Sequence, residues 1–352
     1  MKEGWKMVKL GEVCEFKTGN STPAARITTN ENLYPCYGGN GIRGYIDEFL
    51  FDGNYPIIGR VGALCGNVHI SNGRFYATEH AIAVLPKVDI NYHWLAKALE
   101  ALELRKFASG FAQPVLSVGT LKKLSLPLPP LSEQTRIVSL LDDAFGKLER
   151  SREKALKLLD DAKEIFQAQL KKEMTFKEGW EVKKFSELFK LKSGDALSGK
   201  NIIKGDYPVI GGNGVTGYHN SYNKDGNHVI IGRVGALCGN VHRITGKFWL
   251  TDNAFEVIYD HNKFSNSYLI SMLRYCNLNK YARQAAQPVI SNSSLKDVLI
   301  NIPPIKEQCK ISVRIRLLII KLKQIEEKTN KYLADLDELK QSLLKKAFEG
   351  KL

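Results

Sequence analysis

A long segment of this sequence is present twice. The string IIGRVGALCGNVH occupies residues 57–69 and recurs without a change at residues 230–242, an offset of 173 residues. Shorter repeats keep nearly the same offset: KEGW at 2 and 177, YP followed by GGNG at 34 and 207, AQPV at 112 and 286, and EQ at 133 and 307. Solenoid repeats recur roughly every 20 to 50 residues. The longer period here indicates a tandem duplication of a whole domain.

Each copy begins with a segment that predicts a globular α+β domain. Short apolar runs such as YPIIGRVGALCGNVHI and FYATEHAIAVL are bounded by Gly, Asn and other turn residues, which is typical of irregular β structure. A helical stretch follows in both copies, NYHWLAKALEALELRKFA and NSYLISMLRYCNLNKYA. The spacing GxGxxG at residues 39–44 and 212–217 predicts a β-turn loop, because no helical period follows the glycines.

A proline block ends each globular segment. PLPPLSEQ at residues 127–134 and NIPPIKEQ at residues 301–308 mark boundaries, because proline continues neither a strand ladder nor a helix interior, and Ser132 is a suitable N-cap. We therefore expect globular domains at 1–131 and 176–305, a central helical spacer at 132–175 and a C-terminal helical spacer at 306–352.

The spacers carry heptad patterns. In the second spacer, one row is Ile315, Leu322, Thr329, Leu336 and Leu343, and the other is Leu318, Ile325, Tyr332, Leu339 and Lys346. In the first spacer, Leu141, Leu148, Ala155 and Ala162 lie beside Ala144, Ser151, Leu158 and Ile165. One such stripe alone fits a helical hairpin within one domain. Two matched stripes after matched domains predict two long helices packed as an antiparallel coiled coil that separates the α+β domains with pseudo-twofold symmetry.

The composition narrows the class of partner. Lys and Arg number 51 against 37 acidic residues, a net charge of +14, which favours a polyanion such as nucleic acid, although a basic surface can also serve solubility alone. No apolar stretch reaches the length of a membrane span, so we expect a cytoplasmic protein without membrane contact. The six cysteines form no C-x-x-C pair and are expected to be reduced, with Cys65 and Cys238 packed in cores.

The pattern predicts DNA contact rather than chemistry. The seven His are scattered, and we expect no catalytic residue, no metal site and no cofactor on this chain. Arg60 and Arg233 lie between glycines, where a fork of donors can approach guanine or a phosphate. Amides in similar loops can pair with adenine; they are Asn40, Asn67, Asn213 and Asn240. The alternative is that these Gly-Asn positions supply only turn geometry.

Positions that differ between the copies are candidates for making the two recognised sequences differ. Arg43 aligns with Thr216, Glu79-His80 with Asp252-Asn253, and Arg74 with Lys247. Lys122 and Lys123, with Lys296 near the equivalent place, are candidates for phosphate contact. Because thirteen consecutive residues are identical, we expect a split target whose halves are close to inverted repeats.

The junctions between domain and helix resemble those of a known family. GFAQPVLSVGTLKKLSLPLPPLSEQTRIV (110–138) and AAQPVISNSSLKDVLINIPPIKEQCKIS (285–312) resemble the junction motif of type I restriction-modification specificity subunits, and the resemblance extends over essentially the whole chain. It implies a non-catalytic subunit whose domains each recognise one half of a bipartite double-stranded DNA target. The helices are then expected to set the spacing and to dock two methyltransferase (modification) subunits, which restriction subunits can join. S-adenosylmethionine, ATP and magnesium belong to those partners. A helical scaffold whose twin domains bind proteins is the alternative.

Overall fold

The computed structural model describes residues 3–110, 113–283 and 287–352, and the chain divides into two compact units. Unit 1 comprises residues 1–156 and 330–352, and unit 2 comprises residues 157–329. Two helices of 44 residues, α4 (Leu131–Met174) and α8 (Ile305–Phe348), each contribute one half to each unit. The globular part of unit 1 (residues 3–130) is called domain 1, and that of unit 2 (residues 175–304) is called domain 2.

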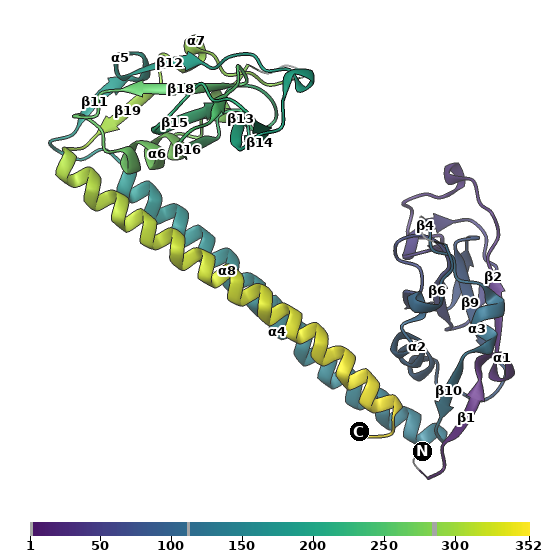
Figure 1. The fold of residues 1–352 in the computed structure, drawn as a ribbon. Coiled ribbons are helices and arrows are strands. Elements are labelled where there is room, and N and C mark those ends of the chain that lie inside the picture. Colours follow the sequence, from purple (N-terminus) through teal and green to yellow (C-terminus); the bar gives the residue numbers. More distant parts are fainter. Residues whose placement is uncertain (1–2, 111–112, 284–286) are drawn as a thin grey trace. The chain divides into compact units, whose positions relative to one another are not determined.

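Domain 1 is built from two small sheets and a short ribbon (Figure 1). The first sheet has the order β2-β9-β6-β7 and the second β4-β3-β8-β5, in which β3 and β8 are parallel. The ribbon pairs β1 with β10. The bounds of these strands are β1 Lys6–Lys9, β2 Cys14–Thr18, β3 Tyr34–Gly38, β4 Gly41–Ile46, β5 Phe51–Asp52, β6 Pro56–Gly59, β7 Val68–Ile70, β8 Arg74–Ala77, β9 Ala81–Pro86 and β10 Ser125–Leu128. The helices are α1 Leu10–Val13, α2 Tyr92–Ala101 and α3 Val118–Lys123, with 3-10 turns η1 Ala24–Arg26 and η2 Leu104–Phe107.

Domain 2 repeats this architecture. Its sheets have the orders β12-β18-β15-β16 and β14-β13-β17, and its ribbon pairs β11 with β19. The strands are β11 Glu181–Lys184, β12 Phe189–Ser193, β13 Tyr207–Gly211, β14 Gly214–His219, β15 Asn227–Gly232, β16 Val241–Thr245, β17 Trp249–Leu250, β18 Ala254–Tyr259 and β19 Leu299–Ile302. The helices are α5 Phe185–Leu188, α6 Asn266–Tyr275 and α7 Asn292–Leu295, with 3-10 turns η3 Gly199–Asn201 and η4 Leu278–Tyr281. The prediction of a duplicated α+β domain is confirmed.

The long helices pack side by side and antiparallel within each unit (Figure 1). In unit 1, Lys340 of α8 lies 5.2 Å above the ring of Phe145 of α4, and about two turns further along α4 Arg152 forms an ion pair with Asp337. In unit 2, Arg314 of α8 forms an ion pair with Glu173 near the end of α4, at 2.8 Å. As the residue number rises along α4, the number of the contacting residue on α8 falls, as the predicted antiparallel pairing requires.

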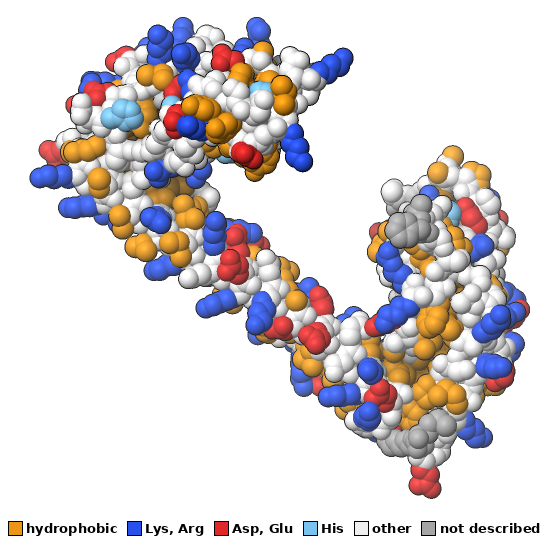
Figure 2. All heavy atoms as spheres, in the orientation of Figure 1, with side chains coloured by type: hydrophobic (Ala, Val, Ile, Leu, Met, Phe, Trp, Pro, Cys, Tyr) orange, Lys and Arg blue, Asp and Glu red, His pale blue; other side chains and the backbone are white. Residues whose placement is uncertain are grey.

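One row of each predicted heptad is confirmed, and most of the other row is wrong. The row through Ile315 and Leu336 is buried or half-buried along α8. The second row turns outward, so that exposed fractions reach 45% at Tyr332 and 66% at Leu158. An α-helix has 3.6 residues per turn, so a strict 3.5-residue pattern drifts about 20° per heptad around the helix. The inward-facing residue is therefore the one four positions after Ala155, Leu159, and not the one three positions after it. Hydrophobic side chains therefore interrupt the charged surface of the helices (Figure 2).

A buried glutamine joins each long helix to its globular domain. The predicted cap is wrong, because α4 begins at Leu131 and Ser132 lies inside it. Gln134, which is 1% exposed, instead accepts a hydrogen bond from the backbone N–H of Asn91, the N-cap of α2, and donates to the carbonyl of Pro129, both at 2.9 Å. Gln308 makes the equivalent bonds to Ser265, the N-cap of α6, and to Pro303. The repeated EQ string thus fixes the angle between domain and helix.

Candidate nucleic-acid interface

Four segments that are distant in sequence converge at one edge of domain 1. They are the β3–β4 turn, the β6–β7 loop, the β8–β9 turn and residues 113–116. The backbone N–H of Arg60 donates to the carbonyl of His80 at 2.8 Å, and that of Gly62 donates to the carbonyl of Pro114 at 2.9 Å. In domain 2, Arg233 donates to Asn253 at 2.9 Å and Gly235 to Pro288 at 3.0 Å. The same convergence therefore occurs in both domains, and it joins the repeated GRVG string to the repeated QPV string. The preceding Ala112 and Ala286 lie outside the described residues.

Two glycines bring the segments close enough to form this edge. A Cβ atom on Gly59 would stand 2.0 Å from the carbonyl oxygen of Gly39, and one on Gly232 would stand 1.9 Å from that of Gly212. No side chain fits at such a distance. The glycines of the repeated string are therefore required by the close approach of strand β6 or β15 to the neighbouring turn, which is the confirmed β-turn of the GxGxxG string.

The converging segments of domain 1 surround an open cleft of about 530 Å³. Parallel strands β3 and β8 both end at this edge, so the loops that follow them lie together. The residues lining the cleft are Gly39, Asn40, Arg43, Val61, Gly62, Ala63, Leu64, His80 and Gln113. Three of them, Asn40, Arg43 and His80, are predicted DNA-contact residues. Loops at a rigid sheet edge, with hydrogen-bond donors beside glycine, form a surface that suits recognition of hydrogen-bonding groups on a ligand.

Arg60 and Arg233 lie beneath this surface. Each is half-buried and donates through Nη1 to a backbone carbonyl, Arg60 to Glu79 at 3.3 Å and Arg233 to Asp252 at 3.2 Å. Arg233 also lies 5.3 Å above the ring of Phe255. These contacts hold the turn that carries His80 or Asn253. Their contact with a base or phosphate stays a prediction, and the observed role is support of the loop.

The four predicted asparagines form two equivalent pairs. Asn67 Nδ2 donates to Asn40 Oδ1 at 3.0 Å, and Asn240 Nδ2 donates to Asn213 Oδ1 at 3.3 Å. All four side chains are exposed. The pairing holds both amides at the rim, and it leaves the Nδ2 group of Asn40 and the Oδ1 atom of Asn67 available as one donor and one acceptor. The same donor–acceptor pattern is present in domain 2.

The predicted residues that differ between the copies fall into two groups. Arg43, Thr216 and Asn253 are exposed, and His80 is half-buried with its Nε2 atom 3.3 Å from Glu79 Oε1. These four belong to the segments that converge at the cleft or to their equivalents in domain 2.

The others lie elsewhere. Arg74 is the first residue of β8, and Lys247 lies two residues before β17, so both are at the strand end away from the cleft edge. There Arg74 forms a 3.0 Å ion pair with Asp52, and Lys247 lies 4.7 Å above the ring of Tyr222. Lys122 and Lys123 are exposed in the last turn of α3, which packs beside α1 rather than at the cleft. Their contact with phosphate stays a prediction.

Sequence reasoning missed the apolar part of the surface. Leu64 lines the cleft with 47% of its surface exposed, and its equivalent Leu237 is 49% exposed. Gln113 lines the cleft too, and it occupies the position of Gln287 in the second copy. Leu64 and Leu237 lie inside the thirteen identical residues, but a leucine side chain has no hydrogen-bond donor that would mark it as a contact residue. An exposed leucine beside donors offers an apolar contact, such as one to a thymine methyl group.

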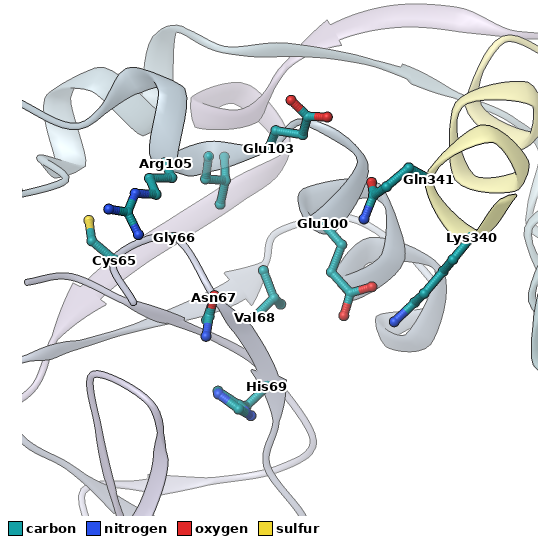
Figure 3. Close-up of a pocket in the computed structure, with 11 residues that line it drawn as sticks. Cys65, Gly66, Asn67, Val68, His69, Glu100, Glu103, Arg105, Lys340 and Gln341 are labelled. Carbon is teal, nitrogen blue, oxygen red and sulfur yellow. The ribbon is translucent and has the colours of Figure 1, made fainter. Parts of the chain in front are cut away.

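Each domain has a second cavity, next to the end of the β6–β7 loop in domain 1 and of the β15–β16 loop in domain 2. In unit 1 it has a volume of about 400 Å³, and the side chains of His69, Glu100 and Lys340 line it (Figure 3). Burial raises the pKa of the Glu100 carboxyl, against the opposing effect of Lys340. Burial lowers the pKa of His69, whose ring lies against Gly41. His69 is therefore a packing residue.

The equivalent cavity of domain 2 is about 350 Å³ and contains His242 and Arg274. Burial lowers the pKa of His242, and the charge of Arg274 lowers it further. His242 is therefore a packing residue too. The predicted core cysteines, Cys65 and Cys238, are 1% and 0% exposed, and burial raises the pKa of both thiols.

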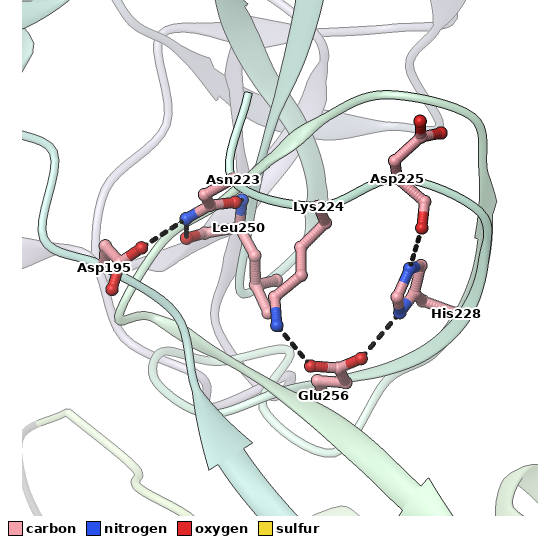
Figure 4. Close-up of polar contacts among 7 residues, drawn as sticks. All are labelled: Asp195, Asn223, Lys224, Asp225, His228, Leu250 and Glu256. Carbon is pink, nitrogen blue, oxygen red and sulfur yellow. Dashed lines mark hydrogen bonds and ion pairs between the residues drawn. The ribbon is translucent and has the colours of Figure 1, made fainter. Parts of the chain in front are cut away.

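The interior of domain 2 contains a charged network that domain 1 lacks at the matching positions. Lys224 Nζ and His228 Nδ1 contact Glu256 at 2.5 and 2.6 Å (Figure 4). Burial raises the pKa of Glu256, but the hydrogen bonds from Lys224 and His228 outweigh that effect and hold it below its usual value. Phe51, Tyr55 and Ala83 occupy these positions in domain 1 and belong to an apolar cluster.

Across 3–110, 113–283 and 287–352, no three His, Cys, Asp or Glu side chains are grouped so that they could hold a metal ion. In the same ranges, no helix is both long and apolar enough to cross a bilayer.

Comparison with known proteins decides the family. The model of the type I restriction modification DNA specificity domain matches residues 2–158 and again residues 177–334. The chain belongs to this family. The specificity subunit of the type I restriction enzyme EcoprrI of Escherichia coli is 44% identical over 140 residues, which are 39% of this chain and 35% of that relative. The chain therefore covers about a third of the length of that relative. The specificity subunit of EcoDI, also from Escherichia coli, is 22% identical over 99% of this chain and 88% of its own length.

Two solved structures show the same fold. A chain from a study of complex assembly and conformational transition of the type I R-M system superposes with a TM-score of 0.80 at 17% identity, covering 100% of this chain and 99% of that one. The HsdS subunit from Thermoanaerobacter tengcongensis superposes with a TM-score of 0.60 at 17% identity, covering 100% and 98%. The predicted class of two recognition-type α+β domains with long helices is therefore confirmed.

Proposed function

We propose that this specificity-family chain is a non-catalytic subunit that binds a bipartite target in double-stranded DNA, each globular domain recognising one half. The convergence of four loop segments at one edge of both domains carries this proposal. At that edge of domain 1 an exposed arginine, paired asparagine amides and an exposed leucine lie together, and they are the groups that contact base edges in a major groove. Domain 2 has the same amides and leucine, with threonine in place of the arginine. The net charge of +14 supplies the attraction to phosphate that precedes base recognition.

The long helices are proposed to set the spacing of the half-sites and to dock two modification subunits. Large hydrophobic side chains remain exposed on both helices and in both units. On α4 they are Leu131, Leu140, Leu156, Leu158 and Ile165, and on α8 they are Ile305, Val313, Leu317, Ile319, Ile320, Ile325, Tyr332 and Leu339. Apolar area of this extent on a helix pair favours burial against a protein partner. The study that solved the similar chain concerns assembly of a type I system, which supports a modification subunit as that partner.

The chemistry is assigned to the partners. We infer that methyl transfer takes place on the modification subunits, and that S-adenosylmethionine, ATP and magnesium bind to them and to restriction subunits rather than to this chain. DNA recognition of this kind takes place beside the chromosome, so we place the chain in the cytoplasm.

Gel-shift titration at two salt concentrations tests DNA recognition. The full chain, in complex with its modification subunits, should lose affinity steeply with salt and keep a preference for one bipartite sequence, which mapping of methylated adenines would identify. Retention of the protein partners without any sequence-preferring DNA binding would instead support the scaffold alternative.

Two adjacent leucines test the docking surface. Leu158 is 66% exposed and Leu159 is 9% exposed. Leu158→Glu should leave the fold intact and reduce co-purification of the modification subunit. Leu159→Glu should disrupt the helix pair itself, which circular dichroism would detect. If Leu158→Glu assembles as the unchanged chain does, that part of α4 does not dock a partner.

A further inference from the structure

The two domains present nearly the same recognition surface, and few residues distinguish them. Of the aligned pairs that differ, Arg74 and Lys247 are set apart by their position. Arg74 begins β8, three residues before Ala77 at the cleft end, which is a separation of about 10 Å along a strand. Its guanidinium is also engaged by Asp52 and lies 4.9 Å above the ring of Phe49. Two differing pairs remain at the cleft, Arg43 with Thr216 and His80 with Asn253. His80 is half-buried and its Nε2 atom lies 3.3 Å from Glu79 Oε1, whereas Arg43 and Thr216 are both exposed.

Arg43 and Thr216 rise from the same place in their domains. The Cδ atom of Arg43 is 2.7 Å from the position that a Cβ on Gly38 would occupy, so the arginine stem lies directly on that glycine. The Cγ2 atom of Thr216 is 2.9 Å from the equivalent position at Gly211. Each side chain thus starts from the second strand of the hairpin and lies against the glycine at the end of the first.

Their available groups differ in kind. Arg43 is exposed and lines the cleft, and among the described residues its guanidinium is seen in no ion pair or hydrogen bond, so its N–H groups are available as donors. Thr216 donates its hydroxyl hydrogen to the carbonyl of Val209 at 3.2 Å. It therefore presents a methyl group and the lone pairs of its oxygen. An arginine fork matches guanine O6 and N7, whereas a threonine methyl group contacts the methyl group of thymine.

We propose that Arg43 and Thr216 are the specificity-determining pair that makes the two half-sites differ. Arg43 selects guanine at one position of the first half-site, and Thr216 selects thymine at the equivalent position of the second. The surrounding bases are shared, because Asn40 and Leu64 have identical equivalents in domain 2. This inference rests on the proposed function, since it assumes that the clefts bind DNA.

Exchange of the pair provides the experiment. The full chain in complex with its modification subunits is used to select bound sequences from a random pool. Thr216→Arg should introduce guanine at one position of the second half-site, with roughly a 5- to 150-fold preference over the original base, and should leave other positions unchanged. Arg43→Thr should remove the guanine preference at the matching position of the first half-site.

A matched control tests whether the effect depends on the position at the cleft. Lys247→Arg changes another position that differs between the copies, but at the far end of the sheet, and it should leave the selected sequence unaltered. If both exchange variants bind DNA with the original half-sites, the assignment of Arg43 and Thr216 is wrong while the proposed function stands. If the unaltered complex selects no sequence, the proposed function itself is wrong.

Discussion

Replacement of Gln308 by alanine should destabilise unit 2 selectively. The side chain is 0% exposed and makes three hydrogen bonds: it accepts from Ser265 N–H at 2.9 Å, and donates to the carbonyls of Lys263 at 2.7 Å and Pro303 at 2.9 Å. Each bond contributes about 1 kcal/mol, and a buried group left unpaired costs about 1–3 kcal/mol. We therefore expect a loss of about 3–5 kcal/mol, and a less well-fixed junction between α6 and α8.

The equivalent change in unit 1 is the matched comparison. Gln134 makes two such bonds, to Asn91 and Pro129, so Gln134→Ala should cost about 2–3 kcal/mol. Hydrogen exchange measured by mass spectrometry distinguishes the units, because each variant should accelerate exchange in its own unit only. A loss of about 3 kcal/mol corresponds to roughly a 100-fold faster exchange in α6 for Gln308→Ala. Unchanged exchange in α6, or equal acceleration in α2, would refute the reasoning.

Three further changes probe other parts of the molecule. Gly232→Ala should destabilise domain 2 by several kcal/mol, about 3 or more, because its Cβ would meet the carbonyl of Gly212, whereas Gly217→Ala, with nothing within 4 Å, should be tolerated in the same thermal-unfolding assay. Because the pKa of Glu256 is held below its usual value of 4.5, its stabilising effect is complete above that pH and is lost as the pH falls further; Glu256→Gln should weaken domain 2 at pH 7 and flatten its acid unfolding. Lys123→Ala should weaken binding to all DNA sequences alike and lower the slope of log affinity against log salt by about 1.

The sequence was sufficient to predict the large-scale organisation. Repeats at a constant offset identify two domains whatever their fold, and the proline blocks mark where the helices begin to within a few residues. Helical periodicity over 44 residues is also a strong signal. The finer register was not predictable, because the 3.6-residue turn moves the inward face across the pattern. Ile325 and Leu339 fit a heptad in the sequence and are nevertheless 39% and 46% exposed.

The candidate site was predicted in residue types but not in its assembly. The chain pattern placed Arg60 beside glycines, which suits both a base contact and a loop support. Only the fold shows that its Nη1 atom is used by the carbonyl of Glu79. The contact between the loop at Gly62 and the QPV segment at Pro114 joins positions about fifty residues apart, and no local signal encodes such a pairing. Leu64 was missed because an isolated leucine in a sequence is ordinarily a core residue.

The identity of thirteen residues in the two copies follows from packing more than from shared bases. Within that string Gly59 meets the carbonyl of Gly39, Cys65 is buried, and the ring of His69 lies against Gly41, so most positions are constrained by their neighbours inside the domain. Elsewhere in the interior the two copies differ greatly. The positions of the Glu256 network in domain 2 are occupied in domain 1 by residues of an apolar cluster. Identity in the string therefore argues less strongly for inverted-repeat half-sites than the sequence alone suggests. The sequence actually recognised depends on the few rim side chains that packing leaves free to differ, and Arg43 with its counterpart in domain 2 is foremost among them.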